Sequence, residues 1–541
     1  MNKITLNGVW AFSFAKDKDL SNDLPEINFS TALAVPGCFD TVQPFFGERG
    51  TGFYKTSVRI GGNVRLCIDG AGVEAKIFWD KKYIGDMPYA YMPEKFYFDA
   101  GDDGEHELIV AVSNRFNKKF FPYFDFYAYG GIFGNVTIEK LPQYFLDNIK
   151  VTTLDYTTGR ISVELDALKF IRKKCAVTFE IDNKKVFDGT FSGKKQSYEL
   201  NVPNFKLWSP DSPALHKLRV IFDRYEEEVT FGIRTLEIRG TDLFLNGGKL
   251  RLMGYNRHDS HPQFGAAMPE SLIAADLAMI KQQGCNFIRG SHYPQRKALL
   301  DLCDRNGILF WEETLGWDVR DEELFTGEFR RSQIDQAKKL ANIHYNHPCI
   351  IIWGFMNETL SEDKRARKII KSVYDAYKSV DSTRWVTFAS NRYERDICMD
   401  IVDIVAMNPY PGWYDMKWEE LSGIHNIEPR LQRLADAIPE DKPFMVSEIG
   451  ASAIYGHRDP HRVRWSEEYQ AELAAEVCRV VFGNPRICGL AFWHFCDAKS
   501  YLNGGRVMGV NDKGMLDQYR RPKLAWNVIT ETLKKLDFKG K

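Results

Sequence analysis

The sequence has no Cys-x-x-Cys motif, and its ten cysteines are scattered singly along 541 residues. Disulfide frameworks and zinc ribbons both require paired or clustered cysteines, so we expect buried free thiols in a reducing compartment. No continuous apolar stretch of signal-peptide length occurs near the amino terminus, and no later segment approaches the length of a transmembrane helix. These absences predict a cytoplasmic protein that is not associated with a membrane.

Neither sign of charge is in excess, because 72 Lys and Arg residues are balanced by 73 Asp and Glu residues, for a net charge of −1. Proteins that bind nucleic acid or anionic membranes need a cationic surface, so neither class of partner is expected. The sequence also lacks a glycine-rich phosphate-binding loop and the Gly-x-Ser-x-Gly turn of a serine hydrolase.

What the chain does contain is enough apolar sequence for several cores, since hydrophobic residues make up 44% of it. At roughly 150 residues per domain, a chain of this length predicts three or four domains. Short runs of alternating apolar and polar residues, separated by turn signals, fill residues 1–142 and continue through 143–238. This pattern is typical of antiparallel sheets and predicts two successive β-sandwiches, the second of immunoglobulin size.

After residue 238 the pattern changes to alternating strands and helices. Eight apolar runs with the character of strands occur within residues 239–541, at 250–255, 285–290, 307–311, 349–355, 384–390, 403–407, 444–448 and 489–495. Amphipathic helical stretches separate most of them, and the connection before the sixth run is the least helical. Eight strands with intervening helices over about 300 residues predict a (β/α)8 TIM barrel.

Two carboxylates stand at the ends of apolar runs of this barrel. Glu358 lies three residues beyond the fourth run, and Glu448 is the last residue of the seventh. Although they are 448 − 358 = 90 residues apart, strand ends on one rim of a barrel converge on one cavity. A single such glutamate is best explained by a salt bridge. Two of them, with Asn357 before the first, are what a retaining glycosidase needs, because one carboxyl group must donate a proton and the other must attack the anomeric carbon.

Five segments resemble the motifs of the family 2 glycoside hydrolases: GYNRHDSHP (254–262), NFIRGSHYP (286–294), GILFWEET (307–314), WGFMNE and MVSEIG. The resemblance covers all three regions in order and implies a jelly-roll-like sandwich followed by an immunoglobulin-like one. It also implies that Glu358 is the general acid/base, that Glu448 is the nucleophile, and that His292 belongs to the sugar-binding site.

Further segments are similar to the β-glucuronidases of this family: DFYAYGG (125–131), NPYPGWY (408–414), FWHF (492–495) and NDKG (511–514). The resemblance implies that Asn511 and Lys513 hold the carboxylate of a hexuronide, with Arg506 near them. A permanent negative charge on the sugar does call for a cation beside a neutral donor. The remaining substrate-binding residues that the resemblance implies are Asp125, Asn357, Tyr410, Tyr414 and Trp493.

These motifs predict a retaining exo-β-hexuronidase that hydrolyses β-D-glucuronides through a covalent glycosyl-enzyme, without a cofactor or a metal. Three departures leave the stereochemistry at C4 open: Ile449 stands where the glucuronidase pattern has Tyr, the spacing from Arg506 to Asn511 is one residue longer, and the first motif is closer to the galactosidases. The alternatives are therefore a β-galacturonidase or β-galactosidase with the same machinery and, more distantly, a non-catalytic carbohydrate-binding protein. Relatives are usually oligomers, so a homo-oligomer is expected.

The sequence HYNH (344–347) has the spacing of a metal-binding pair. It stands where a helix should end before the fourth barrel strand, and zinc would need at least one more ligand nearby. A role at the helix end is therefore the better prediction.

Overall fold

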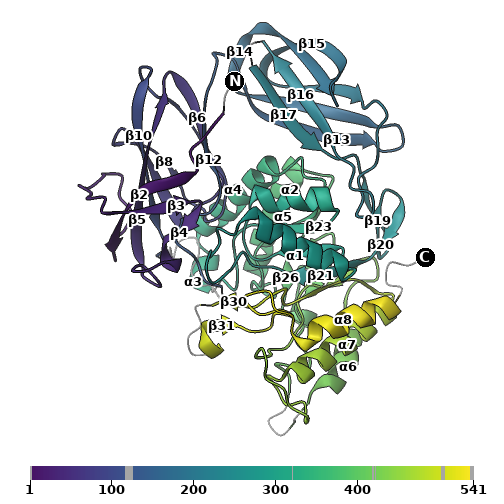
Figure 1. Ribbon diagram of the computed structural model, residues 1–541. Helices are drawn as coiled ribbons and strands as arrows, with labels where there is room; N and C mark the ends of the chain where they lie inside the picture. The colour runs from purple at the N-terminus through teal and green to yellow at the C-terminus, as the bar shows by residue number, and fades with distance from the viewer. Residues whose placement is uncertain are drawn as a thin grey trace.

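The structure is a computed structural model that describes residues 3–115, 126–223, 225–319, 321–416, 420, 422–500 and 506–536. Asp125, one of the predicted sugar-binding residues, lies outside this part of the chain. Figure 1 shows two β-rich regions, drawn in purple and blue, above a barrel that runs from teal to yellow. The chain therefore has the predicted order of two sandwiches followed by a TIM barrel.

The first region is a sandwich of antiparallel sheets, whose buried cores include Trp10, Ile77 and Leu108. The larger sheet contains, in spatial order, β3 (Thr31–Val35), β2 (Gly8–Lys16), β5 (Gly50–Ile60), β10 (Gly104–Ser113), β7 (Glu74–Trp79) and β8 (Lys82–Met87). The smaller sheet contains β1 (Ile4–Thr5), β12 (Val136–Lys140), β6 (Asn63–Ile68) and β9 (Glu94–Asp99). A third, minor pair consists of β4 (Gly37–Cys38) and β11 (Gly131–Ile132).

The second region is built around one long hairpin. Its strands are β13 (Leu146–Asp155), β14 (Arg160–Ile181), β15 (Lys184–Asn201), β16 (His216–Phe222) and β17 (Tyr225–Phe231). Register shifts interrupt the pairing of β14 with β15 between Asp166 and Cys175, so that the first half of β14 pairs with β13 and the second half with β16. The two halves of the hairpin therefore have different neighbours, β13 beside the first half and β16 with β17 beside the second.

A short three-stranded sheet links this region to the barrel, and its strands are β18 (Leu236–Arg239), β19 (Asp242–Leu245) and β20 (Gly248–Leu250). The barrel strands are parallel and follow the chain order β21 (Leu252–Asn256), β22 (Phe287–Gly290), β23 (Leu309–Glu313), β24 (Ile350–Gly354), β25 (Trp385–Thr387), β26 (Ala389–Ser390), β27 (Val405–Met407), β28 (Phe444–Val446) and β29 (Ile487–Phe492). Only Phe388 separates β25, which pairs with β24, from β26, which pairs with β27. These two pieces act as one fifth strand, and the barrel therefore closes with eight strands, as the eight apolar runs predict.

The helices of the barrel cover the outside of this sheet (Figure 1). They are α1 (Glu270–Gln282), α2 (Lys297–Asn306), α3 (Asp321–Leu324), α4 (Gly327–Ile343), α5 (Lys364–Val380), α6 (Ile427–Ala437), α7 (Glu467–Gly483) and α8 (Leu524–Lys535). The connection after the fifth strand holds only a 3-10 turn, Tyr393–Arg395, which confirms the prediction that this connection is the least helical. Among the described residues, no helix combines the length and the apolar character needed to cross a membrane.

Two sets of contacts fix the sandwiches on the barrel. Near the carboxyl ends of the barrel strands, the rings of Tyr91 and Tyr293 stack with centroids 4.0 Å apart, and the hydroxyl groups of Tyr129 and Ser260 are 3.0 Å apart. At the opposite end of the barrel, the guanidinium of Arg234 donates hydrogen bonds to two carbonyl groups just before β24 and at its start. The first sandwich therefore packs on the rim where the predicted catalytic residues lie.

The predictions about cysteine and about HYNH are confirmed. All ten cysteines are free thiols, and all except Cys67 are buried. His344 follows the last residue of α4 and contacts Glu312, whereas His347 contacts Asp304, so the two imidazoles have different partners.

Candidate active site

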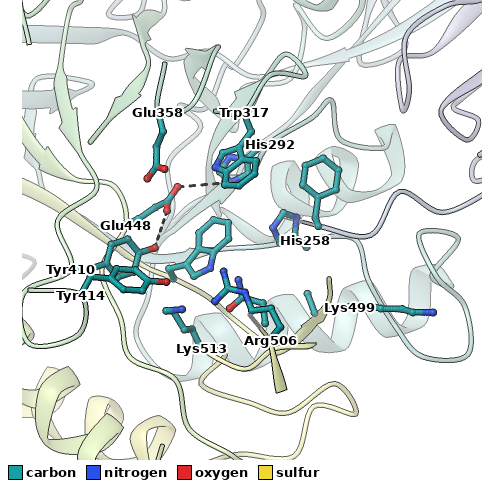
Figure 2. A pocket seen from close by; sticks show the side chains of 14 residues that line it. His258, His292, Trp317, Glu358, Tyr410, Tyr414, Glu448, Lys499, Arg506 and Lys513 are labelled. Atoms are coloured by element: carbon teal, nitrogen blue, oxygen red, sulfur yellow. Dashed lines mark hydrogen bonds and ion pairs between the residues drawn. The ribbon is translucent and has the colours of Figure 1, made fainter. Parts of the chain in front are cut away.

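The two predicted catalytic carboxylates lie on the same rim of the barrel and face one cavity (Figure 2). The regular strands end slightly earlier than the apolar runs suggest, β24 at Gly354 and β28 at Val446. Both glutamates therefore stand on irregular backbone beyond their strands. The cavity is lined by Phe126, His258, His292, Trp317, Glu358, Tyr410, Tyr414, Glu448, Trp493, Ala498, Lys499, Arg506, Asn511 and Lys513.

The backbone that carries Glu358 is held from both sides. The N–H of Glu358 donates to the carbonyl of Ala389 at 2.8 Å, and the N–H of Asn357 donates to the carbonyl of Gly316 at 2.9 Å. Glu358 has a φ of 55°, a left-handed conformation that few side chains other than glycine adopt. Such strained positions persist only where neighbours hold them and are concentrated at active sites.

Arg289, on β22, connects the residues at the bottom of the cavity. Its Nη1 donates to Glu448 Oε1 at 2.6 Å, its Nε to Glu313 Oε1 at 2.8 Å, and its Nη2 to Asn357 Oδ1 at 2.8 Å. The side chain of Arg289 is fully buried. A buried guanidinium with this many charged and polar partners fixes the relative positions of the groups around it.

The two carboxylates differ in their electrostatic environment. Burial and, after it, the negative charge of Glu448 raise the pKa of Glu358 to about 8, although a hydrogen bond from Asn408 acts in the opposite direction. Burial also raises the pKa of Glu448, but the guanidinium of Arg289 and the hydroxyl of Tyr410, which donates to Oε2 at 2.9 Å, oppose that shift. Near neutral pH this arrangement favours a protonated Glu358 beside an ionised Glu448.

Asn357 stands next to Glu358 and has a defined amide orientation. Its Oδ1 accepts hydrogen bonds from Arg289 and, at 3.1 Å, from Nδ2 of Asn408, which also donates to Oε1 of Glu358 at 2.9 Å. The Nδ2 of Asn357 is buried and has no partner in the described part of the protein. A buried donor without an acceptor is costly, so this amide is suited to a ligand oxygen.

Cationic side chains lie at the other end of the cavity. Figure 2 shows Lys513 and Arg506 on the side remote from Glu358. Lys513 is 1% exposed, and its ammonium lies 5.1 Å from the ring centre of Tyr414 and 5.6 Å from that of Trp413. Burial lowers the pKa of Lys513, and Arg506 is close enough to lower it further. No carboxylate among the described residues forms a salt bridge with Lys513, which is the arrangement of a preformed anion site.

Aromatic side chains form the walls between these two ends. Trp493 stacks on His292 with ring centroids 5.1 Å apart, and Tyr410 contacts the ring of Tyr414, whose side chain reaches the mouth and is 63% exposed. His292 is buried, which holds its pKa well below the usual value and keeps the imidazole neutral. Flat apolar faces with polar groups at their edges suit the two sides of a pyranose ring.

The structure brings together every described residue that the sequence predicts for the site. Asn357 is the one described residue among them that does not line the cavity, and it contacts Arg289. Sequence reasoning missed the roles of Trp317, Phe126, Lys499 and Asn408. Asn408 is the first residue of the segment NPYPGWY, so the motif could have indicated it. Nothing in the sequence around Trp317 distinguishes that residue from a packing residue.

One group of side chains outside the cavity has the composition of a metal site. The candidate ligand atoms of Asp304, His347 and Cys349 are buried and lie within 4.8 Å of one another. Asp304 already accepts from His347 Nδ1 at 2.6 Å and from the backbone N–H of Cys349 at 2.9 Å. The carboxylate of Asp304 is thus already bonded to His347 and to the backbone of Cys349, and the described residues supply no fourth ligand to this group. The group is therefore better explained as a hydrogen-bonded link between α2 and the segment before β24 than as a zinc site.

The sequence matches the family model "Glycosyl hydrolases family 2, TIM barrel domain" over residues 236–538 and the model "Glycosyl hydrolases family 2" over residues 144–234. A solved structure of a family 2 β-galacturonidase from Eisenbergiella tayi, bound to glycerol, superimposes with a TM-score of 0.91 at 32% identity and covers 100% of this chain and 97% of that one.

Curated relatives include the β-glucuronidases of Rattus norvegicus and Streptococcus agalactiae. The first is 30% identical over 437 residues, which cover 76% of this chain and 66% of that protein, and the second is 26% identical over 447 residues, which cover 78% and 73%. The chain thus spans about two thirds of the length of the mammalian relative. The fold, the five motifs and these matches together identify the chain as a glycoside hydrolase that belongs to family 2.

Proposed function

We propose that the protein is a retaining exo-β-hexuronidase that hydrolyses β-D-glucuronides. The observation that carries this proposal is the chemistry of the two ends of one cavity. The carboxylates Glu358 and Glu448 lie at one end, and at the other lies the buried cation Lys513, which has no carboxylate partner among the described residues. A neutral sugar would leave Lys513 buried without a counter-charge, whereas a hexuronide supplies one.

The reaction follows from the difference between the two carboxylates. Glu358, which holds its proton near neutral pH, protonates the glycosidic oxygen while Oε1 or Oε2 of Glu448 attacks C1, so that the C1–O bond to the leaving group breaks as the bond to Glu448 forms. Glu358 is then ionised and removes a proton from water, which attacks C1 and releases Glu448. Two inversions give net retention.

The other residues of the site have roles that fit this reaction. The Nδ2 of Asn357, which has no partner among the described residues, is suited to donate a hydrogen bond to the 2-hydroxyl, an interaction that strengthens in an oxocarbenium-like transition state. Tyr410 and Arg289 hold Glu448 and stabilise its ionised form before the attack. Asn511, Lys513 and Arg506 would hold the carboxylate at C5, and Trp493 would lie beneath the ring.

A second candidate is hydrolysis of β-galacturonides. It is favoured by the similarity, over nearly the whole of both chains, to the Eisenbergiella tayi β-galacturonidase, which has also been solved with galacturonate bound and is 32% identical in sequence. The two substrates differ only in the orientation of the 4-hydroxyl group, and both carry the carboxylate that Lys513 would bind.

A panel of chromogenic β-glycosides tests both candidates in one assay. Glucuronide, galacturonide and galactoside, each with the same aryl leaving group, are compared by kcat/KM. We expect kcat/KM for both hexuronides to exceed that for the galactoside by at least tenfold, with the highest value for the glucuronide. A higher kcat/KM for the galacturonide than for the glucuronide would establish the second candidate. A preference for the neutral galactoside would overturn the hexuronidase proposal.

The cytoplasmic location and the homo-oligomeric state remain predictions from the sequence. Between Thr314 and Phe329 the described residues add only the short helix α3 ahead of α4. Light scattering on the purified protein measures the oligomeric state directly.

A further inference from the structure

The segment 511–514 carries Asn511 and Lys513 into the cavity but contains almost no regular structure. Only β31 (Val510–Asn511) forms ladder pairs, over two residues, with β30 (Ala498–Lys499). A long lysine side chain loses much rotamer freedom when it is held in one position, so the backbone beneath it must be fixed by other contacts.

Every residue of this segment is fixed through its backbone. The carbonyl oxygen of Asn511 accepts from His494 Nε2 at 3.1 Å, and that of Asp512 accepts from Ala453 N at 3.0 Å and from Lys523 Nζ at 2.9 Å. The carbonyl oxygen of Lys513 accepts from His494 N at 3.2 Å and from Gln470 Nε2 at 3.4 Å. The same Gln470 Nε2 donates to the carbonyl oxygen of Gly514 at 3.1 Å. In addition, the N–H of Gly514 donates to Oδ1 of Asp497 at 2.9 Å.

Lys523 is the only buried cation among these contacts, and each of the three N–H donors of its ammonium group has an acceptor. It is 0% exposed and donates to the carbonyl of Ala453 at 2.7 Å, to Oδ1 of Asp497 at 2.7 Å and to the carbonyl of Asp512 at 2.9 Å. Three donors meet three acceptors, so Lys523 cannot itself bind substrate. A buried ion pair adds little net stability, and one use for which such pairs are retained is to specify a single arrangement of the chain.

Gln470, on α7, makes the second set of contacts. Its Nε2 donates to the carbonyl groups of Lys513 and Gly514 and, at 2.9 Å, to that of Ala451. Its Oε1 is buried and has no partner within the described residues. The side chain of Gln470 therefore acts here only as a donor. Replacing it with an apolar side chain of the same length would remove the donors and also the buried oxygen that lacks a partner among the described residues.

Both side chains connect the segment to the loop of the nucleophile. Ala451 and Ala453 follow Glu448 by three and five residues, and they are the residues that Gln470 and Lys523 tie to 511–514. Gly514 allows the close approach, because a Cβ there would lie 2.2 Å from the backbone nitrogen of Asp497. The distance between Glu448 and the ammonium of Lys513 thus depends on these contacts.

We propose that Lys523, Asp497 and Gln470 are positioning residues that set the distance between the nucleophile and the carboxylate-binding pair, and thereby the preference for hexuronides. This inference rests on the proposed function of the same cavity. It predicts that loosening the three side chains impairs the hydrolysis of substrates with a carboxylate much more than that of neutral substrates.

The variants Lys523→Met and Gln470→Met test this inference, with Arg251→Met as the matched control. Like Gln470, Arg251 donates only to backbone carbonyl groups, those of residues 481, 482, 484 and 487, but at the opposite end of the barrel. For each variant, kcat/KM on an aryl hexuronide is divided by that on the neutral aryl hexoside, and the melting temperature is measured in parallel.

For both test variants we expect this ratio to fall at least tenfold, mainly through a higher KM for the hexuronide, whereas Arg251→Met lowers only the melting temperature. If Lys523→Met does not fold, Gln470→Met still tests the inference, because it removes hydrogen-bond donors without leaving the carboxylate of Asp497 buried and unpaired. Equal losses on both substrates, or an unchanged ratio in folded Gln470→Met, would overturn the inference. A wild-type enzyme without a preference for hexuronides would instead overturn the proposed function.

Discussion

Arg289 donates a 2.6 Å hydrogen bond from Nη1 to Oε1 of Glu448, whereas Glu358 forms no ion pair with any described residue. Glu358 instead accepts a hydrogen bond from the neutral amide of Asn408. This difference supports the two proposed roles, because the carboxylate beside the guanidinium is favoured in its ionised form and the other is favoured in its protonated form.

The first prediction separates the two carboxylates by mutation. Glu448→Ala should abolish turnover, because no covalent intermediate can form without the nucleophile. Glu358→Ala should still undergo the first step with a very good leaving group but should be slow in the second step, which needs a base. Added azide should restore turnover of Glu358→Ala and give a β-glycosyl azide, since an anionic nucleophile needs no general base. Near-normal activity of either variant on unactivated substrates would refute the assignment.

The pH dependence of kcat/KM follows from the environment of Glu358. Burial and the charge of Glu448 raise the pKa of Glu358 to about 8, and the reaction needs this group protonated, so the rate should fall as the pH rises through that value. The acid limb should report protonation of Glu448, which loses its nucleophilic form as the pH falls. In Glu358→Gln, assayed with an activated leaving group, the basic limb should disappear. If it persists unchanged, the proton belongs to a different residue.

Replacement of Arg289 by Met should affect both the stability and the acid limb. It leaves Glu448 and Glu313 buried without their counter-charge, and breaking a buried pair in this way typically costs about 3–5 kcal/mol in the free energy of unfolding. The pKa of Glu448 should rise, so the acid limb of kcat/KM should move to higher pH by at least about one unit. Urea denaturation and a pH profile of the folded variant measure the two effects. An unmoved acid limb would show that Arg289 does not control the ionisation of Glu448.

The positions of the catalytic pair follow from the sequence because they depend on one topological rule. Carboxyl ends of parallel barrel strands share a rim, so two glutamates after two apolar runs must meet there, and Glu358 and Glu448 do. The motifs similarly placed His292, Tyr410 and Trp493. Lys513 was found through the similarity of NDKG (511–514), which follows the eighth apolar run, to the β-glucuronidases.

Other parts of the site could not be predicted because they depend on packing between distant segments. Lys523 and Gln470 look like ordinary helix-associated polar residues, and only the fold shows that their donors reach the segment 511–514. Trp317 reaches the cavity because its backbone forms a bridge with Asn357 beside Glu358, a pairing that lies outside the regular strands. The sequence pattern carries no sign of either arrangement.

The measurement that tests the central claim most directly compares wild type and Lys513→Ala on an aryl β-hexuronide and on the matching neutral hexoside. Truncating one partner of a buried charge pair costs about 2–5 kcal/mol, which corresponds to a fall of roughly thirty- to several-thousand-fold in kcat/KM on the hexuronide. The neutral hexoside should be hydrolysed no more slowly by the variant, because its hydroxymethyl group has no charge to lose. Equal losses on both substrates, or a wild-type enzyme that already prefers the neutral hexoside, would contradict the assignment of Lys513 and of a hexuronide substrate.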